Sequence, residues 1–388
     1  MTSKGHKKHT ALVRPAMGNW GRNEWAIVGA PCGDIKTLAE KIIAALSGKY
    51  AMAYVDAEHN DEQTAVSPRL NNGAVLEYID ADEAQNISLN SEVNPFAKRK
   101  LLGDCDVVLL NGNHHQGQQQ IVVIDSRKKE SLRKRLDQLT AVKLFLLADG
   151  ETEPFDFIKE AIADWQQIPV FKLSETEQIV NLINNSLQTK APVLNGLVLA
   201  GGKSERMGAD KSAINWHGRE QQYYMADLLK PYCQDVFISC RDEQKAGIDP
   251  NYQTLTDTFT GLGPYGAILS AFRQQPDSAW LVVACDLPLL DRPTLDELIA
   301  SRSTKHVATT FVSPHDGFPE PLITIWEPKS YAELLSFLGQ GYSCPRKVLI
   351  NTHTHVINPS FPESLTNVNT PEELEKVKTI LQQKNITA

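Results

Sequence analysis

The feature that most constrains the fold of this chain is a regular alternation of short apolar runs with longer amphipathic segments, which occurs twice in series. Short apolar runs bounded by turn residues are typical of buried strands, and the segments between them have helical periodicity. Strands that alternate with helices predict parallel sheets with crossover helices. We therefore expect an α/β protein with two three-layer α/β domains.

In the first half, helical segments such as TLAEKIIAALS (37–47) and KESLRKRLDQL (129–139) separate the apolar runs. The expected strands are EWAIVGA (24–30), YAMAYVDAE (50–58), GAVLEYID (73–80), CDVVLLNG (105–112), QQIVVID (119–125) and AVKLFLLAD (141–149). Because helical segments separate these strands, we expect them to be parallel.

The pattern restarts after a polar segment, NNSLQTKAPVLN (184–195), which is expected to be a linker. The second series of expected strands comprises NGLVLAGG (195–202), DVFISCR (235–241), SAWLVVACD (278–286), HVATTFV (306–312) and PLITIW (321–326). A chain of 388 residues is too long for one ordinary core. We expect one domain over residues 1–190 and a second over 191–388.

Composition excludes several classes of protein. The net charge of −8 disfavours nucleic acid as a partner, because nucleic-acid binding requires a concentrated basic face. No apolar run reaches the roughly 18 residues that a membrane helix requires, and the basic start MTSKGHKKHT lacks the apolar region of a secretory signal. Six scattered cysteines indicate neither a zinc site nor a disulfide framework, so we expect reduced, buried thiols in a cytoplasmic protein.

The stretch LAGGKSERMGADK (199–211) places a glycine-rich, cationic loop directly after an expected strand. Gly201 and Gly202 lack side chains, so backbone N–H groups there can approach a bound anion. Arg206 and Lys211 add positive charge, and an Arg can bind phosphate through two donors. A lone Gly-Gly pair would favour a simple turn with a solvated basic face, but the full spacing favours a phosphate site.

Two acidic residues follow other expected strands. Asp286 ends WLVVACD, and Asp257 ends YQTLTD before the glycine-rich stretch TGLGPYGAI. Ligands of open α/β sheets bind beyond the carboxyl ends of the strands, and a carboxylate there can bind Mg²⁺ together with substrate phosphates. The alternative for Asp286 is an ordinary turn or helix-capping acid. The glycines of TGLGPYGAI (261, 263 and 266) would permit close approach of a base or ribose, or would serve only a tight turn.

LAGGKSERMGADK resembles the signature of molybdenum cofactor guanylyltransferases, within the larger family of nucleotidyltransferases. Four downstream stretches match that family in the right order: TDTFTGLGPYGAI, VVACDLP, FPEPLITIW and LTNVNTPEEL. The resemblance covers residues 193–388 and implies a Rossmann-like nucleotidyltransferase domain. It also implies an Mg²⁺-dependent enzyme that transfers GMP from GTP to the molybdopterin cofactor, forming molybdopterin guanine dinucleotide and pyrophosphate.

The resemblance also assigns roles to individual residues. The implied catalytic residues are Arg206, Lys211 and Asp286, with Asp286 as the metal ligand. The implied nucleotide-binding residues are Leu199, Ala200, Gly201, Gly202, Lys211, Ser239, Asp257, Gly263 and Asp286. The implied acceptor-binding residues are Glu320, Asn367 and Asn369. Implied protein partners are molybdoenzymes or their chaperones.

Alternatives to this assignment remain open. The same fold could use CTP or another phosphorylated acceptor. The LAGG form resembles guanylyl enzymes, whereas cytidylyl enzymes more often read LAAG, so the preference for GTP rests on one glycine. A non-catalytic nucleotide-sensing module is a second alternative. Arg346 and Lys347 in SCPRKVL could face the acceptor's phosphate or form a plain solvated basic surface.

The first half contains a second glycine loop, in AIVGAPCGDIKTLAEK (26–41). A regular phosphate loop reads G-x-x-x-x-G-K-[ST], whereas here Gly33 and Lys36 are three positions apart. The half resembles the GTP-binding adapter protein of molybdopterin guanine dinucleotide biosynthesis, with Asn111 where relatives carry a Glu. These departures predict a degenerate P-loop-like adapter or docking domain. His114 and His115 are expected to be polar loop residues without a metal.

Overall fold

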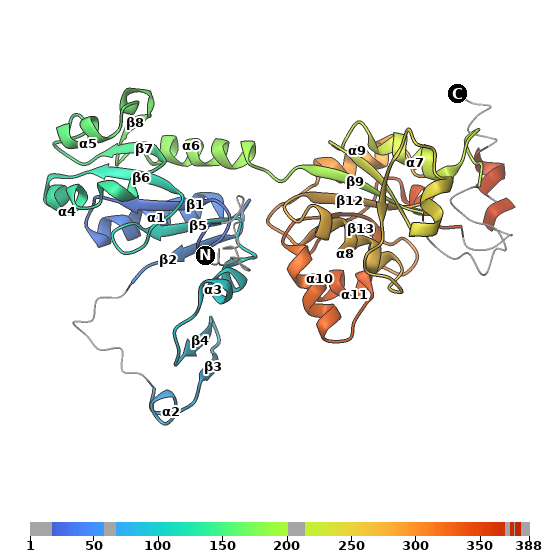
Figure 1. The fold of residues 1–388 in the computed structure, drawn as a ribbon, viewed down its shortest axis with the longest axis horizontal. Coiled ribbons are helices and arrows are strands. Elements are labelled where there is room, and N and C mark those ends of the chain that lie inside the picture. The colour runs from blue at the N-terminus through green and yellow to red at the C-terminus, as the bar shows by residue number, and fades with distance from the viewer. Residues whose placement is uncertain (1–17, 58–66, 201–213, 369–372, 376, 382–388) are drawn as a thin grey trace, which may run out of the picture. The chain divides into compact units, whose positions relative to one another are not determined.

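A computed structural model describes the chain except for residues 1–17, 58–66, 201–213, 369–372, 376 and 382–388 (Figure 1). The chain divides into two compact units, Met1–Thr189 and Lys190–Ala388. The basic amino-terminal segment lies outside the described residues, as do several predicted site residues: Gly201, Gly202, Arg206, Lys211 and Asn369. Among the helices that the structure describes, none combines the length and apolar character needed to cross a membrane.

The N-terminal unit is built on a parallel six-stranded sheet with the order β2-β5-β1-β6-β7-β8. Its strands are β1 (Glu24–Val28), β2 (Met52–Val55), β5 (Val107–Asn111), β6 (Gln119–Ile124), β7 (Val142–Leu147) and β8 (Val170–Lys172). Its helices are α1 (Cys32–Leu46), α2 (Pro68–Asn71), α3 (Pro95–Leu102), α4 (Lys129–Arg133), α5 (Asp156–Ala161) and α6 (Thr176–Thr189).

The central strand β1 explains why the sheet is covered on both faces. All five of its residues are buried, and successive side chains point to opposite faces of a strand. Trp25 and Ile27 pack in a core with residues of α1 and α6. Val28 packs on the opposite face, in a core that includes Leu132 of α4 and Ile158 of α5. The unit therefore has three layers.

The expectation of a parallel strand over residues 73–80 is wrong. This segment forms β3 (Leu76–Asp80), which pairs antiparallel with β4 (Gln85–Leu89) in a separate hairpin. Only the short turn 81–84 joins the two strands, and a connection of that length can join only antiparallel neighbours. The apolar side chains of this hairpin, Leu76, Tyr78, Ile79, Ile87 and Leu89, are exposed.

The expected linker is also largely wrong. Helix α6 continues through residues 184–189, so only residues 190–193 separate it from the next strand. Ile179, Ile183 and Leu187 are buried at a spacing of four residues, and they pack on the core against α1. This helical spacing decides the conformation of a segment whose composition is otherwise polar.

The C-terminal unit contains a seven-stranded sheet with the order β11-β10-β9-β12-β14-β13-β15. Strands β9 to β12 are mutually parallel, while β14 is antiparallel to both of its neighbours. The strands are β9 (Leu194–Leu199), β10 (Val236–Cys240), β11 (Gln253–Thr256), β12 (Ala279–Ala284), β13 (Ala308–Val312), β14 (Pro319–Trp326) and β15 (His355–Ile357).

Helices cover both faces of this sheet as well. They are α7 (Gln221–Leu229), α8 (Pro264–Gln274), α9 (Arg292–Ala300), α10 (Ser330–Gly339) and α11 (Pro345–Asn351). Residues of α7 and α9 share one core with the sheet, and residues of α8, α10 and α11 share the other. The predicted α/β class is confirmed: the N-terminal sheet is parallel, and the C-terminal sheet is mixed because β14 runs antiparallel to its neighbours.

All six cysteines are free, which agrees with the expectation of reduced thiols. The expectation that they are buried is wrong for most of them. Cys240 and Cys285 are buried, Cys32, Cys105 and Cys233 are half-buried, and Cys344 is exposed.

Candidate nucleotide-binding site

The candidate site begins at the carboxyl edge of the C-terminal sheet, where neighbouring strands end together. Leu199 of β9 is paired with Ser239 of β10 and with Ala284 of β12. The central strand β9 leads through buried Ala200 into the segment 201–213, which the structure does not describe. In open parallel sheets, ligands bind beyond this edge. Three segments that are distant in sequence therefore reach one place.

Ser239 and Asp257 form a hydrogen-bonded pair at this edge. Strand β11 ends at Thr256, so Asp257 is the first residue beyond it. The buried hydroxyl of Ser239 donates a hydrogen bond of 2.8 Å to Oδ1 of Asp257. Burial raises the pKa of Asp257, although this hydrogen bond and the charge of Arg241 oppose the rise. The Ser239 hydroxyl thus holds the carboxylate in one orientation.

The glycines after Asp257 have different structural reasons. Gly261 and Gly263 have φ angles of +79° and +57°, a region that favours glycine, and a Cβ at either would meet nothing within 4 Å. Gly266 lies inside α8, where a Cβ would lie 2.1 Å from the carbonyl oxygen of Phe259. The expectation that Gly266 makes room for a ligand is therefore wrong, because the protein's own backbone fills that space.

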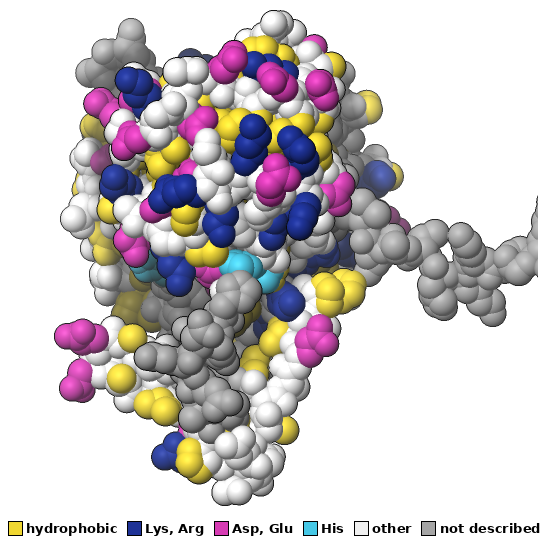
Figure 2. Space-filling model, turned by 90° about the vertical axis from the view of Figure 1, so that its left-hand side faces the viewer, with side chains coloured by type: hydrophobic (Ala, Val, Ile, Leu, Met, Phe, Trp, Pro, Cys, Tyr) yellow, Lys and Arg dark blue, Asp and Glu magenta, His cyan; other side chains and the backbone are white. Residues whose placement is uncertain are grey.

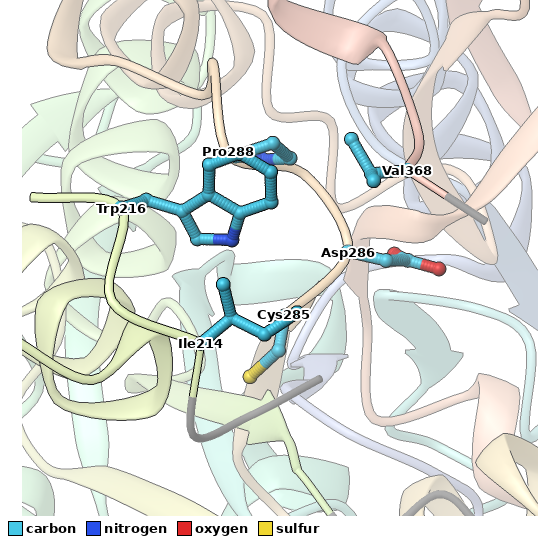
Figure 3. A pocket seen from close by; sticks show the side chains of 6 residues that line it. All are labelled: Ile214, Trp216, Cys285, Asp286, Pro288 and Val368. Atoms are coloured by element: carbon cyan, nitrogen blue, oxygen red, sulfur yellow. The ribbon is translucent and has the colours of Figure 1, made fainter. Parts of the chain in front are cut away.

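Asp286 lies in the turn directly after β12, in a small pocket (Figure 3). Its carboxylate points away from the indole ring of Trp216, whereas the side chain of Cys285 points toward Ile214. The backbone N–H of Val368 donates a hydrogen bond of 2.9 Å to the carbonyl oxygen of Asp286. The pocket is lined by Ile214, Trp216, Cys285, Asp286, Pro288 and Val368.

The Val368 contact brings a predicted acceptor residue to the same place. Asn367 directly precedes Val368 and is half-buried. Val368 packs with Leu289 in a small apolar cluster that also includes Leu374. Two segments about 80 residues apart are therefore fixed beside each other, with Asn367 next to the Asp286 turn.

Glu320 differs from its expected position. It lies within β14 instead of ahead of the strand, and it is buried. Its carboxylate is 3.3 Å from the guanidinium of Arg346, which is also 2.6 Å from Asp316. Arg346 therefore already contacts two carboxylates, which disfavours the interpretation that it awaits an acceptor phosphate.

Sequence reasoning missed the segment that carries Trp216 and His217. The Nε2 atom of His217 donates a hydrogen bond of 2.9 Å to the carbonyl oxygen of Pro288, and the ring stacks on Tyr224 with 3.7 Å between ring centroids. The hydrogen bond supports the Asp286 turn from one side. It joins residues 71 positions apart, and no local spacing in the sequence signals it.

The donor set fits a magnesium ion that also binds substrate phosphate. No group of three His, Cys, Asp or Glu side chains suited to a metal occurs among the described residues. Mg²⁺ does not require such a cage, because proteins commonly bind it through one or two carboxylates while phosphates and water supply the other oxygens. One carboxylate at the end of β12 meets that requirement.

The glycine loop of the N-terminal unit differs in construction. Only Gly29, Ala30 and Pro31 separate β1 from α1, so Gly33 and Lys36 lie inside the helix. A Cβ at Gly29 would lie 2.3 Å from the carbonyl oxygen of Val123, so this glycine permits close packing on β6. The loop is too short to surround a phosphate in the manner of a regular phosphate loop.

The C-terminal unit is thus an open α/β sheet, parallel from β11 through β10 and β9 to β12, with an acidic turn directly after β12. Comparison with known families gives a match over part of this unit: residues 196–356 match the family model of the MobA-like NTP transferase domain. The match lies entirely within the C-terminal unit. The prediction of a nucleotidyltransferase in this half is confirmed.

Individual relatives give the same assignment. The chain is 37% identical over 185 residues to the molybdenum cofactor biosynthesis bifunctional protein of Synechocystis, covering 47% of this chain and 53% of that protein. It is 28% identical over 191 residues to the molybdenum cofactor guanylyltransferase of Shewanella baltica, covering 47% of this chain and 95% of the relative. The chain thus spans about half the length of the Synechocystis protein.

A solved structure is also similar to part of the chain. Molybdopterin-guanine dinucleotide biosynthesis protein A from Archaeoglobus fulgidus is 22% identical, with a TM-score of 0.41. The match covers 49% of this chain and 99% of that one.

Proposed function

We propose that the C-terminal unit transfers GMP from GTP to the terminal phosphate of the molybdopterin cofactor. The structural observation that supports this most is the Asp286 turn, which lies beside Asn367 at the edge where β9, β10 and β12 end. The similarity to molybdenum cofactor guanylyltransferases supports the choice of GTP and of the acceptor.

In the proposed reaction, an oxygen of the acceptor's phosphate attacks the α-phosphorus of GTP. The new P–O bond forms as the bond to the β-phosphate breaks, and pyrophosphate leaves. Such a reaction depends on positioning and charge neutralisation more than on a covalent nucleophile. When bound, Mg²⁺ would withdraw charge from the phosphates.

The chain's own residues would position the two substrates. Asp286 would hold the metal at the end of β12, while Asp257, oriented by Ser239, would bind the nucleotide at the end of β11. Asn367 and Glu320 are proposed to face the acceptor. Arg206 and Lys211, with the glycines before them, are proposed to bind the triphosphate and to stabilise the leaving pyrophosphate.

For the N-terminal unit, we propose an adapter or docking role without GTP hydrolysis. The supporting observation is that Lys36 lies in the second turn of α1 and not in a phosphate loop. There its positive charge helps to lower the pKa of Asp56. An Mg²⁺-dependent GTPase activity of the full chain that the Lys36→Ala variant loses would contradict this proposal.

The product of the reaction tests the function of the C-terminal unit. Purified full-length protein is incubated with Mg²⁺, the molybdopterin cofactor and either GTP or CTP, and the product is identified by mass spectrometry. We expect a guanosine dinucleotide and pyrophosphate. A cytidine dinucleotide would indicate the CTP-using alternative. If neither dinucleotide forms, a nucleotide-sensing module is favoured.

A further inference from the structure

A second cluster of reactive side chains lies in the N-terminal unit. Strands β2, β5 and β1 are neighbours in the sheet, so their carboxyl ends meet at one edge. Asp56 follows β2, His114 follows β5, and Cys32 begins α1 after β1. The Nε2 atom of His114 is 3.4 Å from the Sγ atom of Cys32 and 3.8 Å from Oδ1 of Asp56. The same imidazole nitrogen therefore faces both a thiol and a carboxylate.

The loop after β5 is fixed so that it holds this arrangement. The side-chain amide of Asn113 donates a hydrogen bond of 2.8 Å to the carbonyl oxygen of Ala30, which lies in the loop that precedes Cys32. The guanidinium of Arg135 donates a hydrogen bond of 2.9 Å to the carbonyl oxygen of Asn113. The Asn113 bond thus joins the loop that carries His114 to the loop that precedes Cys32, and the Arg135 bond further restrains the His114 loop.

Asp56 is held as an anion beside His114. Burial alone would raise the pKa of Asp56, but hydrogen bonds from Tyr54, Ala57 and Asn111 and the charge of Lys36 hold it below its ordinary value. The hydroxyl of Tyr54 donates at 2.7 Å and the N–H of Ala57 at 2.8 Å. A carboxylate at this distance favours the imidazolium form of the histidine.

Two features would then stabilise a thiolate on Cys32. Cys32 is the first residue of α1, a helix of 15 residues, and the N-terminus of a helix favours negative charge. An adjacent imidazolium has the same effect, and thiols in such surroundings are nucleophilic near neutral pH. The other charged groups of α1 nearby are Asp34, which contacts Arg127 at 2.6 Å, together with Lys36 and Glu40.

The remaining cysteines show a contrast. Burial raises the pKa of Cys233 to about 12, and burial also raises the pKa of Cys240. Cys344 is exposed and precedes a short helix. Lys, Arg, Asp and Glu side chains intermingle on the face of the N-terminal unit in Figure 2, and histidine side chains reach the surface there. Cys32 is half-buried.

We propose that Cys32 is a reactive thiol, with His114 and the N-terminus of α1 stabilising its thiolate, and that low-molecular-weight disulfides modify it. The thiolate sulfur attacks one sulfur of the disulfide, the S–S bond breaks, and a mixed disulfide forms on Cys32. The other half of the reagent leaves as a thiolate, which takes a proton from solvent. Cys32 is oxidised and the released thiol is reduced. The original thiol proton resides on Nε2 of His114.

Alkylation by iodoacetamide tests the thiolate directly. Full-length protein is labelled for short times between pH 5 and pH 9, and the labelling of each cysteine-containing peptide is measured by mass spectrometry. At pH 6.5 we expect the Cys32 peptide to be labelled faster than the Cys344 peptide, although Cys344 is the more exposed residue. Labelling of Cys344 before Cys32 at this pH would overturn the proposal.

Variants separate His114 from a merely structural role. In His114→Asn we expect labelling of Cys32 at pH 6.5 to slow, while labelling of Cys344 stays unchanged. Asp56→Asn should slow the labelling of Cys32 less. Unchanged labelling of Cys32 in a folded His114→Asn protein would refute the role of His114, and if that variant unfolds, the wild-type comparison decides alone.

The modification itself is tested with glutathione disulfide at pH 6.5. We expect a mixed disulfide on the Cys32 peptide well before one on the Cys344 peptide. Equal modification of both, or modification of Cys344 first, would contradict the proposal.

Discussion

At the residue scale, the proposed reaction depends most on Asp286. The backbone N–H of Val368 holds the backbone carbonyl of Asp286 after β12, a contact that does not involve the side chain. A neutral amide of the same shape would remove the charge that a metal requires while leaving that contact intact. The role of this carboxylate can therefore be tested separately from folding.

We expect Asp286→Asn to lower the rate of nucleotidyl transfer by roughly 100-fold or more, because metal-assisted charge neutralisation contributes several kcal/mol. Product formation is measured at saturating GTP, and folding is checked by thermal unfolding. Asp235→Asn is a matched control, because Asp235 precedes β10 at the opposite end of the sheet, where it contacts Gln253. Near-normal turnover of Asp286→Asn would remove the residue from the metal-binding role.

Ser239 shows what local pattern can and cannot predict. The resemblance to nucleotidyltransferases implied a polar side chain near the nucleotide at this position. The structure shows that its hydroxyl contacts Asp257, which lies 18 residues further along the chain, after the neighbouring strand β11. Which polar groups contact each other depends on strand order, and strand order is not encoded in the spacing of either strand alone.

At the scale of elements, helix α8 depends on the absence of a side chain at Gly266. The hydroxyl of Ser270 accepts hydrogen bonds from the N–H groups of Thr258 and Phe259 and donates one to the carbonyl oxygen of Gly266. The loop after Asp257 is therefore packed directly on the first turns of α8. This packing holds the carboxyl-terminal end of β11 against the helix.

We expect Gly266→Ala to destabilise the C-terminal unit by about 1–3 kcal/mol, the usual cost of overpacking, since its Cβ would meet the carbonyl oxygen of Phe259 at 2.1 Å. Thermal unfolding measures the change. Gly339→Ala is the matched control, because a Cβ there would meet nothing within 4 Å at the end of α10. That control should be neutral or stabilised by up to about 1 kcal/mol. Equal stability of both variants would contradict the packing argument.

The elements that sequence reasoning predicted best are the central, fully buried strands, such as β1, β6 and β12, whose apolar runs are continuous. It missed β4, β8 and β15, which are short or exposed and lie in a hairpin or at a sheet edge. A strand buried on one face or not at all carries little apolar signal. Its pairing is decided by neighbours that are distant in sequence.

At the scale of the whole molecule, each unit has its own core, so conditions can act on one unit alone. In the C-terminal unit, burial and, to a lesser degree, the charges of the nearby His353 and His355 together lower the pKa of His306 to about 4. The rings of His353 and His355 lie 4.4 Å and 5.1 Å from that of His306. This cluster of three histidines connects the segment that precedes β13 with the start of β15.

We expect the C-terminal unit to lose stability as the pH falls from about 6.5 toward about 4. In this window the unfolded state binds a proton on His306 and the folded state does not, so the stability contributed by the neutral histidine is present above pH 6.5 and is lost on acidification. Hydrogen exchange in β13 and β15, compared with β1 and β6 of the other unit, measures the effect.

The His306→Asn variant provides the control for this pH dependence. It should flatten the dependence of exchange in β13 and β15 over the same window, because the titrating group is removed. An unaltered pH dependence in the folded variant would show that other groups cause the acid sensitivity.

The sequence by itself determined the α/β class, the central strands, and the acidic residues that follow strands in the C-terminal half. These are local properties, because periodicity and a polar residue after an apolar run are set by neighbours in the chain. Only the tertiary structure decided which strand ends meet. Strand order places Ser239 against Asp257 and His114 beside Cys32 and Asp56, and the packing of the segment around Val368 places Asn367 beside the Asp286 turn. These contacts join residues between 18 and 82 positions apart, and they arise from the packing of whole elements, which no single segment specifies.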